Sequence, residues 1–198
     1  MKFEKIFLFL TLIVLLLACS SGSNEGDALF EKGKYKDAVA SYNNYLESNS
    51  SDVKTLYNRG RAYQELGDFD KAEEDFISAI KSETKNVNAR LSLSKLYYEQ
   101  EFYNKAVLWA EQALEINENS SQAHFLAARA KHQLGYVDGA LESYTLSIKL
   151  NSDFGEAYLY RGALKIHLGK IQSACEDFRK AQVLNVKEVS AIITKYCN

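Results

Sequence analysis

The sequence is most unusual in what it lacks. None of its 198 residues is proline, whereas an average usage of about 5% would give roughly ten. This absence excludes polyproline linkers, collagen-like segments and turns built on proline, and it permits long uninterrupted helices. Neither charge sign is in excess, because 24 Lys and Arg residues are interspersed with 26 Asp and Glu residues. Without a basic surface to neutralise phosphates, nucleic acid is excluded as a partner.

The amino-terminal end has the layout of a targeting segment. Met1–Lys5 is short and basic, Ile6–Leu17 is almost entirely apolar, and Ala18 and Cys19 follow at once. A helix of about twelve residues is about 18 Å long, whereas a bilayer core needs about 20 residues. The pattern therefore predicts a secretory signal peptide rather than a membrane span.

The end of this segment predicts a lipid anchor. Leu16-Leu17-Ala18-Cys19 resembles the bacterial lipobox, which implies cleavage before Cys19 by signal peptidase II and a diacylglycerol on its sulfur. The alternative is an ordinary signal peptide whose border contains a cysteine. We expect residues 1–18 to be the signal peptide and residues 19–26 to be the lipidated cysteine and a flexible tether. Because Ser20 and not aspartate follows Cys19, analogy with lipoprotein sorting favours the periplasmic face of an outer membrane, if the cell has one.

A repeat of 34 residues fills the rest of the chain. Its most regular column is alanine, at Ala38, Ala72, Ala106, Ala140 and Ala174. Aromatic or apolar residues recur three before and four after each alanine, which defines an amphipathic helix. A small residue stands twelve before, at Gly26, Gly60, Ser94, Ala128 and Gly162. A turn glycine separates the two halves in every repeat but the third, where Glu101 takes its place, so each unit is predicted to be helix, turn, helix.

This pattern resembles the tetratricopeptide repeat (TPR) family. The second repeat carries the resemblance most clearly, at Leu56–Gly60, Tyr63, Leu66–Ala72, Phe76 and Ala79–Ile80. The resemblance implies an all-α fold, an α-α superhelix (TPR solenoid) of five helix-turn-helix repeats with a C-terminal capping helix. We expect a TPR domain over residues 24–198, with repeats at 19–52, 53–86, 87–120, 121–154 and 155–188 and the cap at 189–198. The family's proline at each repeat end is missing, and helix caps are predicted instead at Asp52, Asn86, Ser121 and Asp153.

The resemblance also implies which side chains line the concave groove. Fixed positions of each first helix do so in the family, and the candidate partner-binding residues are Lys54, Tyr57, Arg61, Gln64, Lys95, Tyr98, Phe125, Arg129, His132 and His167. Arg61, Lys95 and Arg129 occupy equivalent positions and are expected to form a ladder of cations beside aromatic rings. Such a surface suits an acidic peptide. The alternative is that these are solvated charges paired with neighbours such as Glu65 and Glu99. The family's carboxylate clamp is absent.

Catalysis and cofactor binding have no support in the sequence. His124, His132 and His167 share no metal-ligand spacing, and a zinc site at His132 and His167 would need two more ligands. Neither serine nor cysteine lies in a nucleophile motif, and no glycine-rich loop follows a strand. Acidic stretches such as Glu73-Glu74-Asp75 are interpreted as solvated helix faces. We therefore predict no enzyme, metal or cofactor.

Two cysteines and one tryptophan remain. Cys175 and Cys197 are candidates for a disulfide that would tie the last repeat to the cap, the alternative being two half-buried thiols. Trp109 is expected to point outward beside Leu108 and near Phe102, as a contact patch or a partly covered aromatic.

The sequence as a whole predicts an exported, non-enzymatic adaptor. It is expected to be a bacterial TPR-containing lipoprotein, held on the membrane by acyl chains and binding a partner protein or peptide as a monomer. Two alternatives stay open: a capture protein for a small ligand or glycan, and an architectural oligomer joined through Trp109 or the cap.

The anchor yields a direct prediction. Cells given labelled fatty acid should incorporate the label into this protein, and Cys19→Ser should abolish incorporation, because the Cys19 sulfur is the expected attachment atom. Autoradiography of the purified protein measures this. Unchanged labelling in the variant, or none in the wild type, would refute the anchor.

Overall fold

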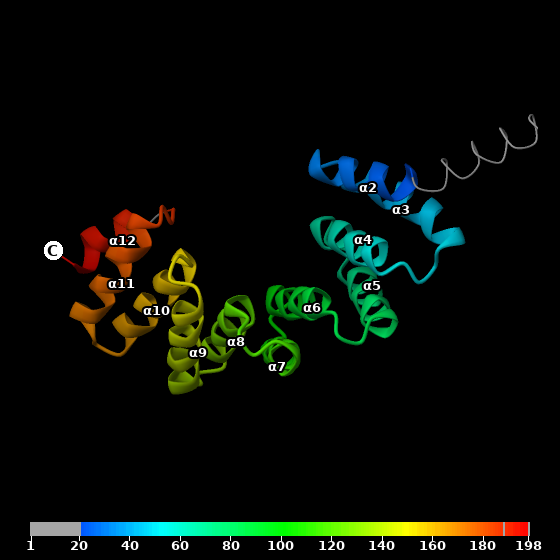
Figure 1. The fold of residues 1–198 in the computed structure, drawn as a ribbon. Coiled ribbons are helices and arrows are strands. Elements are labelled where there is room, and N and C mark those ends of the chain that lie inside the picture. The colour runs from blue at the N-terminus through cyan, green and yellow to red at the C-terminus, as the bar shows by residue number, and fades with distance from the viewer. Residues whose placement is uncertain (1–20, 188, 198) are drawn as a thin grey trace, which may run out of the picture. The chain divides into compact units, whose positions relative to one another are not determined.

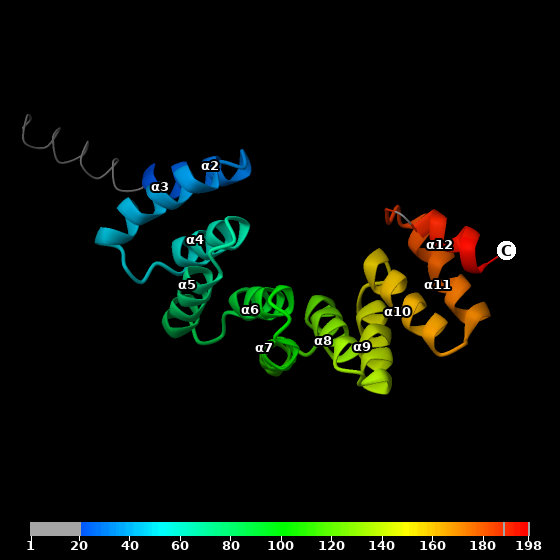
Figure 2. The ribbon, with the colours of Figure 1, turned by 180° about the vertical axis from the view of Figure 1, so that it is seen from behind.

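The structure, a computed structural model, describes residues 21–187 and 189–197. Every regular element in these ranges is an α-helix, and short turns join successive helices (Figures 1 and 2). The eleven helices are α2 Ser21–Glu31, α3 Tyr35–Ser48, α4 Val53–Glu65, α5 Phe69–Ser82, α6 Val87–Glu99, α7 Tyr103–Ile116, α8 Ser121–Gln133, α9 Val137–Leu150, α10 Gly155–His167, α11 Ile171–Val183 and α12 Val189–Tyr196. The predicted five helix pairs and capping helix are confirmed.

Two compact units make up the chain. Unit 1 ends at Ala89 and contains α2 to α5, and unit 2 begins at Arg90 and contains most of α6 and all of α7 to α12. The predicted signal peptide, residues 1–18, and the lipidation site Cys19 lie outside the described residues. Within the described ranges, no helix combines the length and the apolar composition that crossing a bilayer requires.

The first helix begins earlier than the sequence predicts. Residues 21–26, assigned above to a flexible tether, form the start of α2. The Ser23 hydroxyl accepts a hydrogen bond from Thr55 of α4 at 3.1 Å. Gly26 lies against the ring of Tyr42 in α3, so closely that an added Cβ would come within 2.4 Å of a ring carbon. The tether prediction is wrong for this segment because its small residues are needed for close packing on α3 and α4.

The turn inside each repeat uses left-handed backbone. Gly67 is typical, with φ at 76°. The predicted exception keeps the same conformation without glycine, since Glu101 has φ at 63°, an arrangement that is uncommon for a residue with a Cβ. Asn185 does the same after α11, with φ at 59°, where asparagine is better tolerated.

Two of the four predicted helix caps are confirmed. The Asp52 carboxylate accepts from the backbone N–H of Thr55 at 2.8 Å, and the Asn86 side chain accepts from Ala89 at 2.9 Å. The other two predictions are wrong. Ser121 is already helical, and the preceding residue, Ser120, caps α8. Asp153 lies two residues before the start of α10, whose N-cap makes no side-chain hydrogen bond.

The repeating alanines form the centre of the packing. All five are 0% exposed, because each lies where the second helix of a repeat meets the first. Aromatic rings fill the space beside them, as where Gly60 admits the Phe76 ring at 2.8 Å from the position of an added Cβ. In the third repeat Ser94 takes the glycine's place and donates a hydrogen bond to the Ala106 carbonyl at 2.8 Å.

One buried ion pair ties three helices of unit 1 together. Arg59 of α4 donates from Nε and Nη2 to the two Asp75 carboxylate oxygens of α5, at 2.8 and 2.6 Å. Its third nitrogen donates to Asn43 of α3 at 2.7 Å. Asp75 is 4% exposed, so the interpretation of Glu73-Glu74-Asp75 as a solvated face is wrong for Asp75. Burial raises the pKa of Asp75, and the hydrogen bonds from Arg59 offset this only in part.

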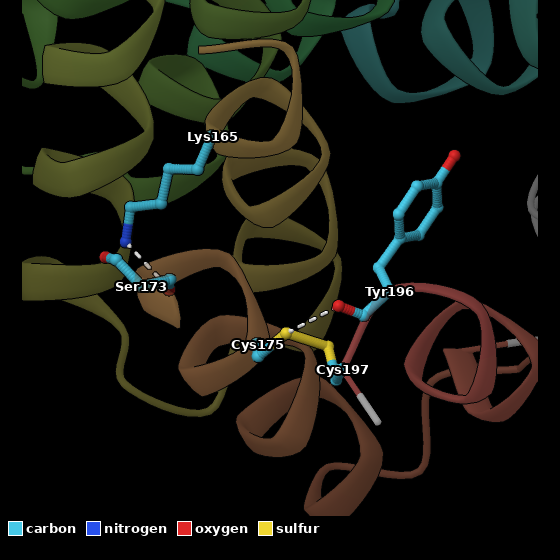
Figure 3. Close-up of a disulfide and its surroundings, with 5 residues drawn as sticks. All are labelled: Lys165, Ser173, Cys175, Tyr196 and Cys197. Carbon is cyan, nitrogen blue, oxygen red and sulfur yellow. Dashed lines mark hydrogen bonds between the residues drawn. A yellow bond between two sulfur atoms is a disulfide. The ribbon is translucent and has the colours of Figure 1, made fainter. Parts of the chain in front are cut away.

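The same arrangement recurs in unit 2, three repeats later. Arg161 of α10 donates to both Asp177 oxygens of α11, at 3.0 and 2.7 Å, and to Thr145 of α9 at 3.2 Å. Lys165 adds a second cation 2.7 Å from Asp177 and also donates to the Ser173 carbonyl (Figure 3). Each unit is thus held at one repeat boundary by an arginine shared among three helices.

The capping helix α12 covers the exposed side of α11. Val189 is 1% exposed and packs, with Ile192 and Ile193, against the cluster around Phe178. Tyr196, predicted on the same face, is 38% exposed, since its ring turns away from α11 where the helix ends (Figure 3).

A disulfide holds the end of the cap. Cys175 of α11 is bonded to Cys197, the residue after α12, with an S–S distance of 2.01 Å (Figure 3). Beside it, the Cys175 sulfur lies 3.6 Å from the Tyr196 carbonyl oxygen. The bond crosslinks the last full repeat to the eight-residue cap, a helix too short to be stable alone.

The buried pair in unit 1 predicts a large asymmetry between neighbouring acids. Asp75→Ala should lower the free energy of unfolding by about 3 kcal/mol, because it leaves Arg59 charged, largely buried and unpaired. Glu74→Ala, at an exposed position, should change it by less than about 0.5 kcal/mol. Replacing both partners, with Arg59→Met and Asp75→Leu, should restore most of the loss. Urea denaturation measures all three, and equal effects of the two single variants would contradict the burial of Asp75.

Candidate partner-binding face

The candidate site is the surface formed by the first helix of each repeat, called the first-helix face below. In unit 1 it is the surface of α2 and α4, and in unit 2 the surface of α6, α8 and α10. The predicted groove residues belong to these helices, and the structure distinguishes those already engaged within the chain from those left open to a ligand.

Arg61 in unit 1 is open to a ligand. Its guanidinium carbon lies 4.6 Å from the centre of the Phe30 ring and 5.9 Å from that of Tyr57, and no carboxylate of the described residues pairs with it. Arg61 and Phe30 line a pocket of about 450 Å³, together with Glu31 and Tyr35. Two further predicted residues of α4, Lys54 and Gln64, already interact within the chain. Lys54 pairs with Asp27 at 2.6 Å, and Gln64 also has a partner.

Asp27 is a residue of this face that the sequence analysis missed. Its carboxylate accepts from the Tyr42 hydroxyl at 2.8 Å and from the Asn58 amide at 2.7 Å, besides its pairing with Lys54. Burial alone would raise the pKa of Asp27, but these donors lower it below its usual value. The signal was available, because Asp27 stands one repeat before Arg61 in the same column.

Arg129 is the central residue of the face in unit 2. Its guanidinium carbon lies 4.0 Å from the centre of the Tyr98 ring in α6 and 5.0 Å from that of Tyr160 in α10. The Nε atom is buried without a hydrogen-bond partner, and Arg129 makes no ion pair within the described residues. Stacking on rings holds the cation in place while leaving its hydrogen-bonding capacity unused.

The middle cation of the predicted ladder, Lys95, is paired. This side chain pairs with Glu99 one helical turn away, at 3.7 Å, which is the alternative stated above for these charges. Both partners are largely exposed, so the pair contributes little to stability. Of these three cations, Arg61 in unit 1 and Arg129 in unit 2 make no ion pair within the described residues.

Phe125 is also misassigned by the sequence analysis. It is 6% exposed and its ring lies 4.6 Å from that of Phe154, so it belongs to the core beneath Arg129 and not to the surface. Tyr98 lies on the surface as predicted, where its hydroxyl accepts from Gln133 of α8 at 3.2 Å.

His132 and His167 lie side by side, with ring centres 6.2 Å apart. Burial lowers the pKa of His132 below its usual value, and the neighbouring His167 lowers it further. No group of three His, Cys, Asp or Glu side chains suited to a metal ion occurs in the described part of the chain.

Trp109 is half-buried and occupies the position that Asp75 and Asp177 hold in other repeats. Leu108 and Phe102 nearby are 52% and 53% exposed. Trp109 is thus a partly covered aromatic, and the exposed apolar area belongs to its neighbours.

Family profiles match three parts of the chain. A TPR repeat profile matches residues 26–67, a tetratricopeptide repeat profile matches 53–83, and a profile of anaphase-promoting complex, cyclosome, subunit 3 matches 76–145. Residues 26–83 are therefore similar to tetratricopeptide repeats. No curated protein matches it in sequence.

Solved structures extend the similarity over most of the chain. MamA from Desulfovibrio magneticus RS-1 has a TM-score of 0.75 at 17% identity, over 84% of this chain and 94% of that one. YrrB, described as a TPR protein with an unusual peptide-binding site, has 0.68 at 21%, over 89% and 91%. A thermophilic TPR protein from Thermus thermophilus has 0.70 at 20%, over 89% and 96%. These likenesses show the fold, which is a TPR solenoid.

The histidine pair gives a prediction of pH dependence. His132 should titrate below pH 6.5 because its imidazolium is penalised by burial and by His167. Between that folded-state pKa and 6.5 the unfolded chain binds more protons, so stability should fall as pH decreases through this range. Histidine resonances followed by NMR measure the pKa, which His167→Gln should raise. A His132 pKa above 6.5 in the wild type would contradict the structure.

Proposed function

We propose that the protein is a non-enzymatic adaptor that binds an acidic segment of a partner protein on its first-helix faces. TPR solenoids are protein-interaction scaffolds, and YrrB, similar in fold, is described as having a peptide-binding site. The observation that carries the proposal is the state of Arg61 and Arg129. Each lies on aromatic rings, and neither has a carboxylate partner among the described residues.

The contrast with the other arginines supports this assignment. Arg59 and Arg161 direct their hydrogen bonds to buried aspartates and hold helices together. Arg61 and Arg129 pair with no aspartate among the described residues and contact aromatic rings instead. Arginine forms strong bidentate hydrogen bonds with carboxylates, and aromatic rings beside it supply apolar contact area typical of binding hot spots.

We further propose that the adaptor acts at a bacterial envelope. The signal peptide pattern and the Cys19 motif support an exported protein held by acyl chains. The residue after Cys19 favours the outer membrane, periplasmic face, in a cell with two membranes. In this arrangement the lipid holds the chain on the membrane as a monomer, and the solenoid presents its first-helix faces to a soluble or membrane-bound partner.

The proposal predicts charge-dependent capture of one partner. In crosslinking pull-downs from native cells, Arg61→Glu with Arg129→Glu should lose the main partner, because both carboxylate-binding cations become repulsive. The matched control is Arg179→Glu, at an exposed arginine of α11, which should retain it. Mass spectrometry of the crosslinked species makes the comparison, and recovery of the same partner by the double variant would contradict the proposal.

A further inference from the structure

Two equivalent sites, one on the first-helix face of each unit, carry central residues of opposite charge. In unit 1 the site holds Asp27, with the Tyr42 hydroxyl directed to it. Three repeats later, in unit 2, the same two positions are Arg129 and Tyr144. The neighbouring positions differ as well. Lys54 and Asn58, which donate to Asp27, correspond to Glu156 and Tyr160, and Glu156 makes no ion pair with Arg129 among the described residues.

In unit 1 the donors around Asp27 have their acceptor within the chain. Tyr42 is 0% exposed, and its hydroxyl donates to the Asp27 carboxylate, which also receives Asn58 and Lys54. Three donors therefore share one carboxylate, and the Tyr42 hydroxyl has its hydrogen-bond acceptor within the chain.

The equivalent site in unit 2 holds donors to which no acid is bound among the described residues. Tyr144 is 0% exposed, and its hydroxyl has no hydrogen-bond partner in the described part of the chain. The neighbouring Arg129 also has a buried Nε without one. Leaving such groups unpaired inside a protein is costly, and two adjacent cases on the first-helix face point to a missing acceptor.

Arg129, Tyr98 and Tyr160 act electrostatically on the Tyr144 hydroxyl, and no carboxylate of the described residues does so. Burial raises the pKa of Tyr144 well above its usual value of 10.0, so the hydroxyl keeps its proton at neutral pH and is available to donate. The Tyr98 hydroxyl accepts from Gln133, which leaves its own proton to donate.

We propose that the place formed by Arg129, Tyr144, Tyr98 and Tyr160 binds one carboxylate group of a partner chain, which supplies the acceptor that Asp27 supplies in unit 1. The inference rests on the proposed function. It narrows that function from a face that binds an acidic segment to one subsite that binds a single carboxylate. The carboxylate accepts from Arg129 and from the Tyr144 hydroxyl. Because that hydroxyl is covered, the half-buried Arg129 side chain shifts as the ligand enters.

A planar anion fits this place better than a tetrahedral one. Tyr98 comes from the preceding repeat and Tyr160 from the following one, and both rings lie close to the guanidinium. A guanidinium donates hydrogen bonds from its edge, where the N–H groups lie. A carboxylate meets that edge in the same plane.

The test follows the Arg129 Nε–H resonance by NMR in the full chain purified in detergent. The probes are a short end-blocked peptide with glutamate side chains, an N-acetylated alanine peptide with a free C-terminal carboxylate, and inorganic phosphate at equal ionic strength. At least one peptide should shift the resonance saturably and bind more tightly than phosphate, and the peptide that does so identifies the source of the carboxylate. No saturable shift with either peptide, or tighter binding of phosphate, would overturn the proposal.

Hydroxyl deletion provides the second arm. Tyr144→Phe should weaken the peptide Kd by about tenfold, the contribution of one hydrogen bond to a charged group. Tyr136→Phe, at a 58% exposed tyrosine of the same unit, should leave it unchanged. An unchanged Kd in Tyr144→Phe would also overturn the proposal.

Stability separates a ligand-binding hydroxyl from a structural one. Tyr42→Phe should lower the Tm because it removes a hydrogen bond to Asp27, whereas Tyr144→Phe should not. Equal losses of Tm would show that the Tyr144 hydroxyl already has a hydrogen-bond partner within the chain. The proposed carboxylate site would then be refuted.

The experiments distinguish a failure of the carboxylate subsite from a failure of the proposed adaptor function. If the partner is lost with Arg61→Glu and Arg129→Glu but Tyr144→Phe binds carboxylate normally, the adaptor function stands and the subsite does not. If the charge-reversed variant retains its partner, the proposed function is refuted, and with it the assignment of the subsite to the partner's carboxylate, even where Tyr144→Phe weakens peptide binding.

Discussion

The structure depends on the close approach of two helices inside each repeat. A small residue on the first helix, such as Gly26, Gly60 or Gly162, lets an aromatic ring of the second helix lie almost on its backbone. That contact fixes the separation of the helices and so places the first-helix face. It also sets the position of the ring, which is phenylalanine in the second and fifth repeats and tyrosine in the first and fourth. Where it is tyrosine, the contact carries a hydroxyl to the edge of the first-helix face, and the neighbouring residue decides whether that hydroxyl is used.

The charged residues divide into two groups by the same geometry. Arg59 and Arg161 face the second helix of their own repeat and are neutralised by Asp75 and Asp177, which lie beside the packing ring. Arg61 and Arg129 lie on the opposite side of their helices and find rings instead of acids. In α4 a separation of two residues thus distinguishes Arg59, which stabilises the fold, from Arg61, which is available to a partner. Arg161 of α10 and Arg129 of α8 occupy the corresponding positions in other repeats. Lys95, with Glu99 one turn away, shows that a cation on the first-helix face is not free in every repeat.

The repeat period was sufficient to predict the fold, since it specifies helix, turn and helix, the buried alanines and a cap over residues 189–196. It also identified Arg61 and Arg129 as groove residues. It could not predict that Asp75 is buried, because three consecutive acids are typical of a solvated helix face. The burial depends on Arg59 of the previous helix, which donates to the Asp75 carboxylate. Phe125 was predicted on the surface because it occupies a groove position of the repeat. The repeat pattern carries no information on which neighbours cover that position, and here Phe154 packs against the Phe125 ring. Asp27 was missed because the groove residues were assigned from the second repeat onward, although Asp27 stands in the column of Arg61. Its pairing with Tyr42, Asn58 and Lys54 is a tertiary effect.

The central claim is that a partner binds through the first helices of the repeats. Hydrogen–deuterium exchange of the full chain, with and without the partner recovered by crosslinking, tests it most directly because it reports every helix at once. The account predicts slower amide exchange in α4, α8 and α10 on binding, with α5 and α9 little changed. Slower exchange confined to α5 and α9, with the first helices unaffected, would contradict it.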